Sequence, residues 1–107
     1  MTGELVVLST VGTAEDADRI ARMLVEGGLA ACVNVVPGVR SIYRWKGRVE
    51  SDEELLLVMK TTAERFAALE AALLQAHPYS LPEVMAFRVE RGHAAYLEWL
   101  EQSVSGS

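Results

Sequence analysis

The sequence predicts a single α+β domain in which helices cover one face of a four-stranded sheet. Three observations lead to this fold class. Extended and helical patterns follow one another along the 107 residues in the order β-α-β-β-α-β, with one further helix at the end. Two strands contain unbroken apolar runs, which is typical of central strands, and the second and third strands are joined by a short turn. Two right-handed crossovers and one hairpin in this order form the ferredoxin-like split βαβ arrangement.

The first strand and the first helix are predicted from local pattern. Leu5–Leu8 is a continuous apolar run rich in β-branched residues, which favours a buried strand. Thr13 is the expected helix cap, with Asp16 three residues later, and Gly27-Gly28 ends the helix. The apolar residues between them recur at helical spacing: Ala17, Ile20, Ala21, Leu24 and Val25.

A long hairpin follows. Its first strand is predicted over Leu29–Trp45, with a bend or bulge at Pro37-Gly38. Lys46-Gly47 forms the turn, and the return strand Arg48–Thr61 contains the apolar run Leu55–Met59. An arm of about 14 residues is roughly 45–50 Å long, whereas a compact domain of this size is about 34 Å across. We therefore expect the hairpin to bend or to project beyond its own domain.

The remaining elements complete the pattern. Thr61 and Glu64 form a candidate capping box for the second helix, which stops at His77-Pro78 because the residue before proline avoids helical geometry. A last strand is predicted over Glu83–Val89, and a third helix follows Gly92. The expected apolar faces of the second and third helices are Phe66, Leu69, Leu73 and Ala76, and Tyr96, Leu97, Leu100 and Val104. Residues 103–107 are predicted to be a disordered tail of the single domain 1–107.

Composition and charge argue against several partners. The chain has 10 Lys and Arg residues against 15 Asp and Glu residues, a net charge of −5. We therefore expect neither a nucleic acid nor an anionic membrane as a partner, because both are recognised by basic clusters. No apolar run approaches ~20 residues, and we expect no signal peptide. Cys32 is the only cysteine, which excludes an internal disulfide and favours the cytoplasm.

The central strands raise the question of what covers their second face. Two helices cover one face of a four-stranded sheet, yet the central strands are apolar on both faces. A second copy of the chain is the simplest cover. A two-residue turn places Arg40 opposite Glu53 and Tyr43 opposite Glu50. This charged arm is either a solvated strand face or an edge that docks on a neighbouring subunit.

Five segments of the sequence are distinctive as a set. They are Leu29–Gly38, Ser41–Gly47, Leu57–Thr62, His77–Tyr79 with Pro82-Glu83, and Tyr96–Leu100. In this order they resemble the CutA family, the divalent-cation tolerance proteins, over about Val6 to Leu100. The resemblance implies a ferredoxin-like homotrimer with hairpins exchanged between neighbours, similar in architecture to the PII signalling proteins. It also implies a cytoplasmic protein linked to tolerance of copper and other divalent metals.

The chain departs from this family pattern at two positions. Some members linked to copper have a cysteine where this chain has Ser9, and a second histidine where it has Ala76. Only His77 of that set is present. The resemblance therefore implies weak rather than high-affinity copper binding.

His77, Cys32 and Glu83 are the candidate metal ligands. Imidazole, thiolate and carboxylate suit divalent ions, and copper binds most tightly among them. Each candidate has a structural alternative: Cys32 can be a small buried hydrophobic residue, and His77 can cap a helix C-terminus. No C-x-x-C, H-x-H or H-E-x-x-H spacing is present, so we expect no preformed tetrahedral site within one chain. A divalent metal such as copper is the expected ligand, and no cofactor is required.

Tyr43, Trp45, Lys60 and Tyr79 form a second candidate set near strand ends. They either line a cleft between subunits or pack as interface anchors. The acidic run Asp52–Glu54 is either a solvated segment or a source of oxygen ligands for hard cations.

Three functions stay open on the sequence alone. The first is a non-enzymatic trimer that binds divalent metal weakly and contributes to the metal-ion response. The second is a PII-like signalling module that binds a small anionic ligand between subunits, although the sequence has no glycine-rich phosphate loop. The third is a small enzyme, which we do not expect because no nucleophile, base and orienting residue stand at a recognisable spacing.

Overall fold

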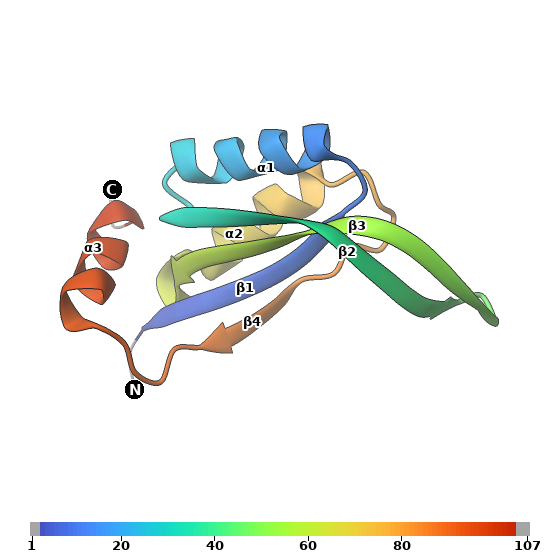
Figure 1. Ribbon diagram of the computed structural model, residues 1–107. Coiled ribbons are helices and arrows are strands. Elements are labelled where there is room, and N and C mark those ends of the chain that lie inside the picture. Colours follow the sequence, from blue (N-terminus) through green and yellow to red (C-terminus); the bar gives the residue numbers. More distant parts are fainter. Residues whose placement is uncertain (1–2, 105–107) are drawn as a thin grey trace.

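The computed structural model describes residues 3–104 and confirms the predicted fold class (Figure 1). Four strands, β1 (Glu4–Val11), β2 (Cys32–Trp45), β3 (Arg48–Thr62) and β4 (Met85–Arg88), form an antiparallel sheet in the order β2-β3-β1-β4. The helices are α1 (Ala14–Glu26), α2 (Ala63–Ala76) and α3 (Ala94–Val104). The strands with unbroken apolar runs, β1 and β3, are the central ones, as predicted.

The core lies between the sheet and the helices α1 and α2. Alternate residues of the central strands point into it, and Val7, Leu57 and Met59 are fully buried there. The helices contribute buried residues at the predicted spacing: Ala17, Ile20 and Leu24 from α1, and Leu69 and Leu73 from α2. α3 packs at the end of the sheet where β1 begins and β3 ends, and it buries Leu100 and Val104. No helix in this described part of the chain is long and apolar enough to cross a membrane.

The helix caps were predicted with mixed success. Thr13 caps α1 as expected, because its Oγ1 accepts a hydrogen bond of 3.1 Å from the Asp16 N–H. The capping box at Thr61 is wrong, since α2 is capped at Thr62 and the Thr62 side chain makes no capping hydrogen bond. Thr61 shares the inward face of β3 with Met59, and its hydroxyl donates instead to the carbonyl of Leu29 at 2.6 Å.

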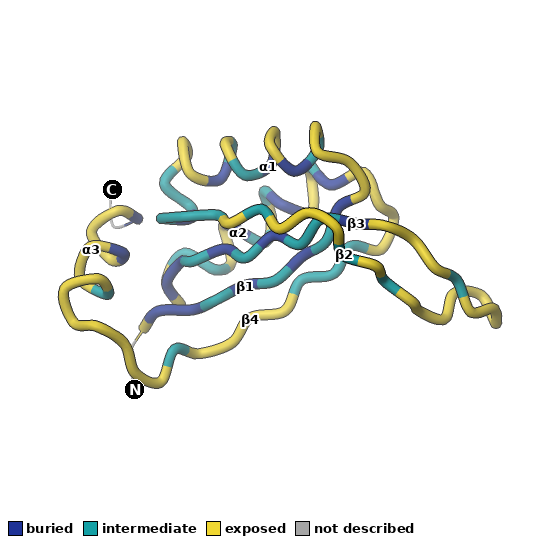
Figure 2. The backbone as a smooth tube through the Cα atoms, viewed as in Figure 1, coloured by how far each residue is buried: buried dark blue, intermediate teal, exposed yellow. Residues whose placement is uncertain are grey.

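The hairpin has the predicted turn and register. Lys46 and Gly47 have φ angles of 51° and 79°, the left-handed geometry that a tight two-residue hairpin turn needs. Arg40 pairs with Glu53 and Tyr43 pairs with Glu50. The register shifts between Val36 and Val39, which confirms the bulge at Pro37-Gly38. The arm projects from the body (Figure 1), and most of its residues are exposed (Figure 2), in a molecule that measures 44 × 25 × 22 Å.

Three element boundaries differ from the prediction. β2 begins at Cys32 rather than at Leu29, because the N–H groups of Leu29 and Ala30 bond to the Leu24 carbonyl at the end of α1. β4 is shorter than predicted and spans four residues. α3 includes residues 103 and 104, where the tail was expected to begin, because Val104 is buried; residues 105–107 lie outside the described residues.

The second face of the sheet is largely open in the single chain. Cross-strand pairing puts Val6 beside Phe87, and Leu8 between Val58 and Met85. Phe87 is 51% exposed and Met85 is 49% exposed. The central strands thus present apolar side chains on a face that α1 and α2 do not cover, as the sequence predicted.

Candidate functional site

His77 lies at the C-terminus of α2 and is almost fully buried. Its Nε2 is 2.8 Å from the carbonyl oxygen of Thr10, and its Nδ1 accepts a hydrogen bond of 3.1 Å from the Tyr79 N–H. Because a carbonyl only accepts, Nε2 carries the proton, and the unprotonated Nδ1 accepts from the Tyr79 N–H. The ring is therefore neutral, and it ties β1 to the segment that follows α2.

Two tyrosines are each hydrogen-bonded to a carboxylate of β3. The Tyr79 hydroxyl donates to Glu54 Oε2 at 2.7 Å, and the Tyr43 hydroxyl donates to Asp52 Oδ2. Burial, and then the bond to Glu54, raise the pKa of Tyr79. The bond to Asp52 raises the pKa of Tyr43 to about 12. Both phenols therefore stay protonated at neutral pH and act as hydrogen-bond donors.

These tyrosines and carboxylates line a cleft of about 790 Å³ between the hairpin arm, from Arg40 to Trp45, and the segment that joins α2 to β4. Tyr43, Trp45 and Tyr79, three of the four residues predicted for a cleft between subunits, line this cleft of the single chain together with Glu83. Sequence reasoning noted Asp52 and Glu54 only as part of an acidic run, although both line the cleft as tyrosine partners. The signal that could have found Asp52 is the hairpin register, because Tyr43 lies diagonally across from it.

The fourth predicted cleft residue, Lys60, lies elsewhere, on the open face of the sheet. Its register partners there are Val6 and Cys32. The Lys60 ammonium donates to the side-chain oxygen of Asn34 and is 4.0 Å from the Cys32 sulfur. Cys32 is only partly buried, so the expectation of a buried core cysteine is not met.

The metal candidates are not gathered into one site. Within residues 3–104, no group of three or more His, Cys, Asp or Glu side chains is arranged to hold a metal ion. His77, Cys32 and Glu83 therefore do not form a ready-made site in a single chain. His77 also has both ring nitrogens hydrogen-bonded, so it can bind an ion only by giving up one of these bonds.

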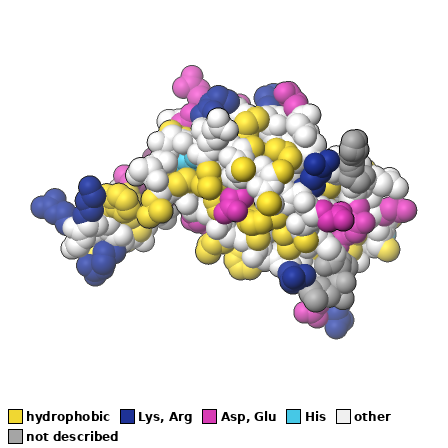
Figure 3. All heavy atoms as spheres, turned by 180° about the vertical axis from the view of Figure 1, so that it is seen from behind, with side chains coloured by type: hydrophobic (Ala, Val, Ile, Leu, Met, Phe, Trp, Pro, Cys, Tyr) yellow, Lys and Arg dark blue, Asp and Glu magenta, His cyan; other side chains and the backbone are white. Residues whose placement is uncertain are grey.

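The tip of the hairpin is basic. Seen from behind, Lys and Arg side chains gather at the projecting end of the molecule (Figure 3). The exposed basic residues of this tip are Arg44, Lys46 and Arg48. The Lys46 ammonium lies 5.8 Å from the centre of the Trp45 ring, within the range of a cation–π contact. The arm thus carries positive charge and an aromatic side chain well outside its own core.

Comparison with known proteins gives consistent matches. The family described as "CutA1 divalent ion tolerance protein" matches residues 5–103. A relative from Thermus thermophilus named divalent-cation tolerance protein CutA is 50% identical over 94% of this chain and 97% of its own. A mouse relative named protein CutA is 47% identical over 85% of this chain, and the match covers only 53% of the mouse protein.

Solved structures agree with the fold. That of a divalent cation tolerance protein (Cut A1) from Thermus thermophilus has a TM-score of 0.93 at 49% identity, covering 95% of this chain and 99% of its own. A structure of a PII-like protein CutA from Nostoc has a TM-score of 0.88 at 35% identity, covering 94% of this chain and 97% of its own.

Proposed function

The chain belongs to the CutA1 divalent ion tolerance family, and we propose that it contributes to divalent-cation tolerance as a homotrimer that binds copper-class ions weakly. The observation that carries this proposal is the uncovered apolar face of the sheet. Phe87 and Met85 are half-exposed on it beside Val6 and Leu8. Such a face is costly to leave in water, and further copies of the same chain are the simplest cover.

The projecting hairpin supports the same assembly. Its Trp45 is 40% exposed on an arm that leaves the body of the domain. Aromatic residues at such positions are typical interface anchors. The open face and the arm are therefore two separate surfaces of one chain that can each contact another copy. Two such contacts per chain fit a closed ring of copies better than an isolated domain.

The arrangement of His77 accounts for weak binding. Its Nε2–H donates to a backbone carbonyl, which is the usual orientation of a histidine that binds metal through its other nitrogen. Nδ1 becomes available only if the Tyr79 N–H moves away, and this cost lowers the affinity. Since one chain gathers no three ligands among its described residues, water or a second copy completes the coordination. Glu83 and the partly exposed Cys32 are the further candidates.

Calorimetric titration with Cu²⁺ tests the metal assignment. The native chain, His77→Ala, Cys32→Ser and Glu83→Gln are compared after circular dichroism has shown that each is folded. We expect micromolar or weaker binding that is lost in His77→Ala. Equal affinity in all four proteins would show that unselective surface carboxylates bind the ion.

One observation favours a second function, a PII-like signalling role with a small anionic ligand. Arg40 and Arg44 line the cleft beside Tyr43 and Trp45, where guanidinium groups can bind an anion and aromatic rings can stack on a planar group. Titration with a panel of nucleotides, using Arg40→Gln and Arg44→Gln as variants, tests this role. Saturable binding that these variants weaken would support it, and the absence of binding by native protein would reject it.

We further propose that the protein is not an enzyme and acts in the cytoplasm. The strongest candidate for a general base in the described chain, His77, has both ring nitrogens in structural hydrogen bonds. The single cysteine is consistent with a reducing compartment.

A further inference from the structure

Glu54 is a buried carboxylate that lines the cleft and has no cation beside it. It is only 9% exposed, and its side chain accepts a hydrogen bond of 2.7 Å from the Tyr79 hydroxyl. Among the residues that the structure describes, Glu54 makes no ion pair. A buried charge without a counter-charge is costly. The cleft is therefore electrostatically incomplete in the single chain.

The arginines of the arm do not supply the missing charge. Arg40 and Arg44 line the same cleft, but neither forms an ion pair with Glu54. The register explains this, because Arg40 lies across from Glu53 whereas Val39 lies across from Glu54. Successive side chains of a strand point to opposite faces. Arg40 and Glu54 therefore leave the hairpin on opposite sides.

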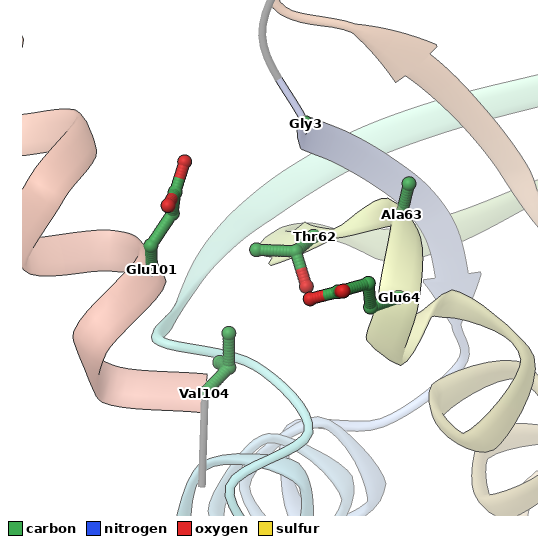
Figure 4. A pocket seen from close by; sticks show the side chains of 6 residues that line it. All are labelled: Gly3, Thr62, Ala63, Glu64, Glu101 and Val104. Atoms are coloured by element: carbon green, nitrogen blue, oxygen red, sulfur yellow. The ribbon is translucent and has the colours of Figure 1, made fainter.

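Lys60 has the complementary deficit. It is half-buried on the open face of the sheet, where its ammonium donates to the uncharged side-chain amide of Asn34. In the described part of the chain Lys60 makes no ion pair. Figure 4 shows two carboxylates beyond the end of β3, Glu64 and Glu101, at a pocket of about 320 Å³ that Lys60 does not line. Its own chain thus leaves this cation without an anion.

Glu54 and Lys60 cannot reach each other within one chain. Both lie on β3, six positions apart, so the alternation of side chains places them on the same face. Six residues of strand span roughly 20 Å at about 3.3 Å each, whereas an ion pair needs a nitrogen and an oxygen within about 4 Å. The two charges are therefore at separate places on one surface.

We propose that Lys60 of one copy pairs with Glu54 of the next copy across the open face, an inference that rests on the proposed homotrimer. A neighbour that covers this face removes water from both charges, and an ion pair between copies satisfies both at once. Outside the arm, Lys60 is the only basic residue that the described register places on this face, beside Val6 and Cys32. It is thus the cation that the face offers.

The pairing also determines the kind of contact. Each copy gives its Lys60 to one neighbour and receives the Lys60 of the other neighbour at Glu54. Such a contact joins two different patches, and it closes into a ring when the rotation between copies allows it. The ammonium of the neighbour enters the cleft beside Tyr79 and Tyr43. The four residues predicted for a cleft between subunits then meet, although three of them come from one chain and Lys60 from another.

A double-mutant cycle on the full chain tests this pair. Sedimentation velocity over a urea series gives the urea concentration at which half of the trimer has dissociated. Lys60→Met and Glu54→Gln each leave one buried charge unpaired, so each should lower this midpoint. The double variant removes both charges and should return the midpoint toward the native value. Residues roughly 20 Å apart in one chain have additive effects, so this recovery requires contact between copies.

The possible failures are distinguishable. A native chain that sediments as a monomer without urea would overturn both this pair and the proposed homotrimer. A native trimer in which the losses of the two single variants simply add would overturn the pair alone. Circular dichroism establishes that each variant is folded, and Glu54→Gln keeps an oxygen that accepts from the Tyr79 hydroxyl.

Two further variants serve as controls. Lys60→Arg keeps the positive charge and should keep the midpoint close to the native value. Glu53→Gln is the matched change at the neighbouring residue, which is exposed and lies across from Arg40. Combined with Lys60→Met, it should add its own small effect without any recovery. Recovery with Glu53→Gln as well would show that the cycle reports net charge, and it would contradict the pair.

Discussion

The hydroxyl of Tyr79 donates a 2.7 Å hydrogen bond to Glu54, a carboxylate that is only 9% exposed. This bond ties the segment after α2 to the base of the hairpin. The same tyrosine donates its backbone N–H to His77, whose ring in turn reaches the Thr10 carbonyl. β1, β3 and the segment after α2 are thus linked through one residue, at the point where the hairpin leaves the body.

Tyr79→Phe should destabilise the fold more than Tyr43→Phe does. Removing the Tyr79 hydroxyl leaves the buried Glu54 carboxylate without that donor, which costs about 1–3 kcal/mol. The matched change at Tyr43 removes a bond to an exposed partner, Asp52, where water replaces the lost donor. Urea unfolding of both variants measures the difference. Equal stability of the two would show that the Tyr79–Glu54 bond has no special structural role.

The phenol of Tyr43 should titrate well above the ordinary tyrosine range. Its bond to Asp52 raises its pKa from 10.0 to about 12. The folded state therefore holds the phenolic proton more tightly than the unfolded state does. The stabilisation is fully present below pH 10.0 and is lost as the pH rises toward about 12.

Ultraviolet titration of tyrosinate in native protein and in Tyr43→Phe measures this shift. The difference between the two curves should be a single late transition. Asp52→Asn should move that transition to lower pH, because the carboxylate is the main cause of the shift. A difference curve between native protein and Tyr43→Phe with its midpoint near the ordinary tyrosine value would contradict the hydrogen bond.

A charge placed on the open sheet face should prevent assembly without unfolding the chain. Phe87 is 51% exposed in a single chain, so Phe87→Arg removes little intrachain packing. A buried unpaired guanidinium between subunits costs several kcal/mol. Sedimentation velocity should show a smaller species with a native circular dichroism spectrum. Leu74→Arg, on the outer side of α2 and 45% exposed, is the control and should assemble normally.

The elements that could be predicted from sequence are those governed by local rules. The Lys46-Gly47 turn fixes the hairpin register, because a two-residue loop leaves only one pairing of the flanking strands. The apolar runs in β1 and β3 identified the central strands, because only a strand that is covered on both faces needs apolar side chains on both.

The features that could not be predicted depend on contacts between segments that are distant in the sequence. Thr61 resembled a helix cap, but the side-chain alternation of β3 turns it into the core, where it meets the Leu29 carbonyl. The sequence indicated His77 both as a possible metal ligand and as a possible helix cap. Its hydrogen bond to the Thr10 carbonyl could not be predicted, because the two residues are 67 positions apart and no local pattern indicates the contact.

Native mass spectrometry of the full chain with Cu²⁺ tests the central claim most directly, because it reports assembly and metal content together. The account predicts a species of three times the 11.7 kDa chain mass, with copper carried by this trimer and absent from any residual monomer. A protein that stays at the mass of one chain, or a monomer that binds copper as well as the trimer does, would contradict it.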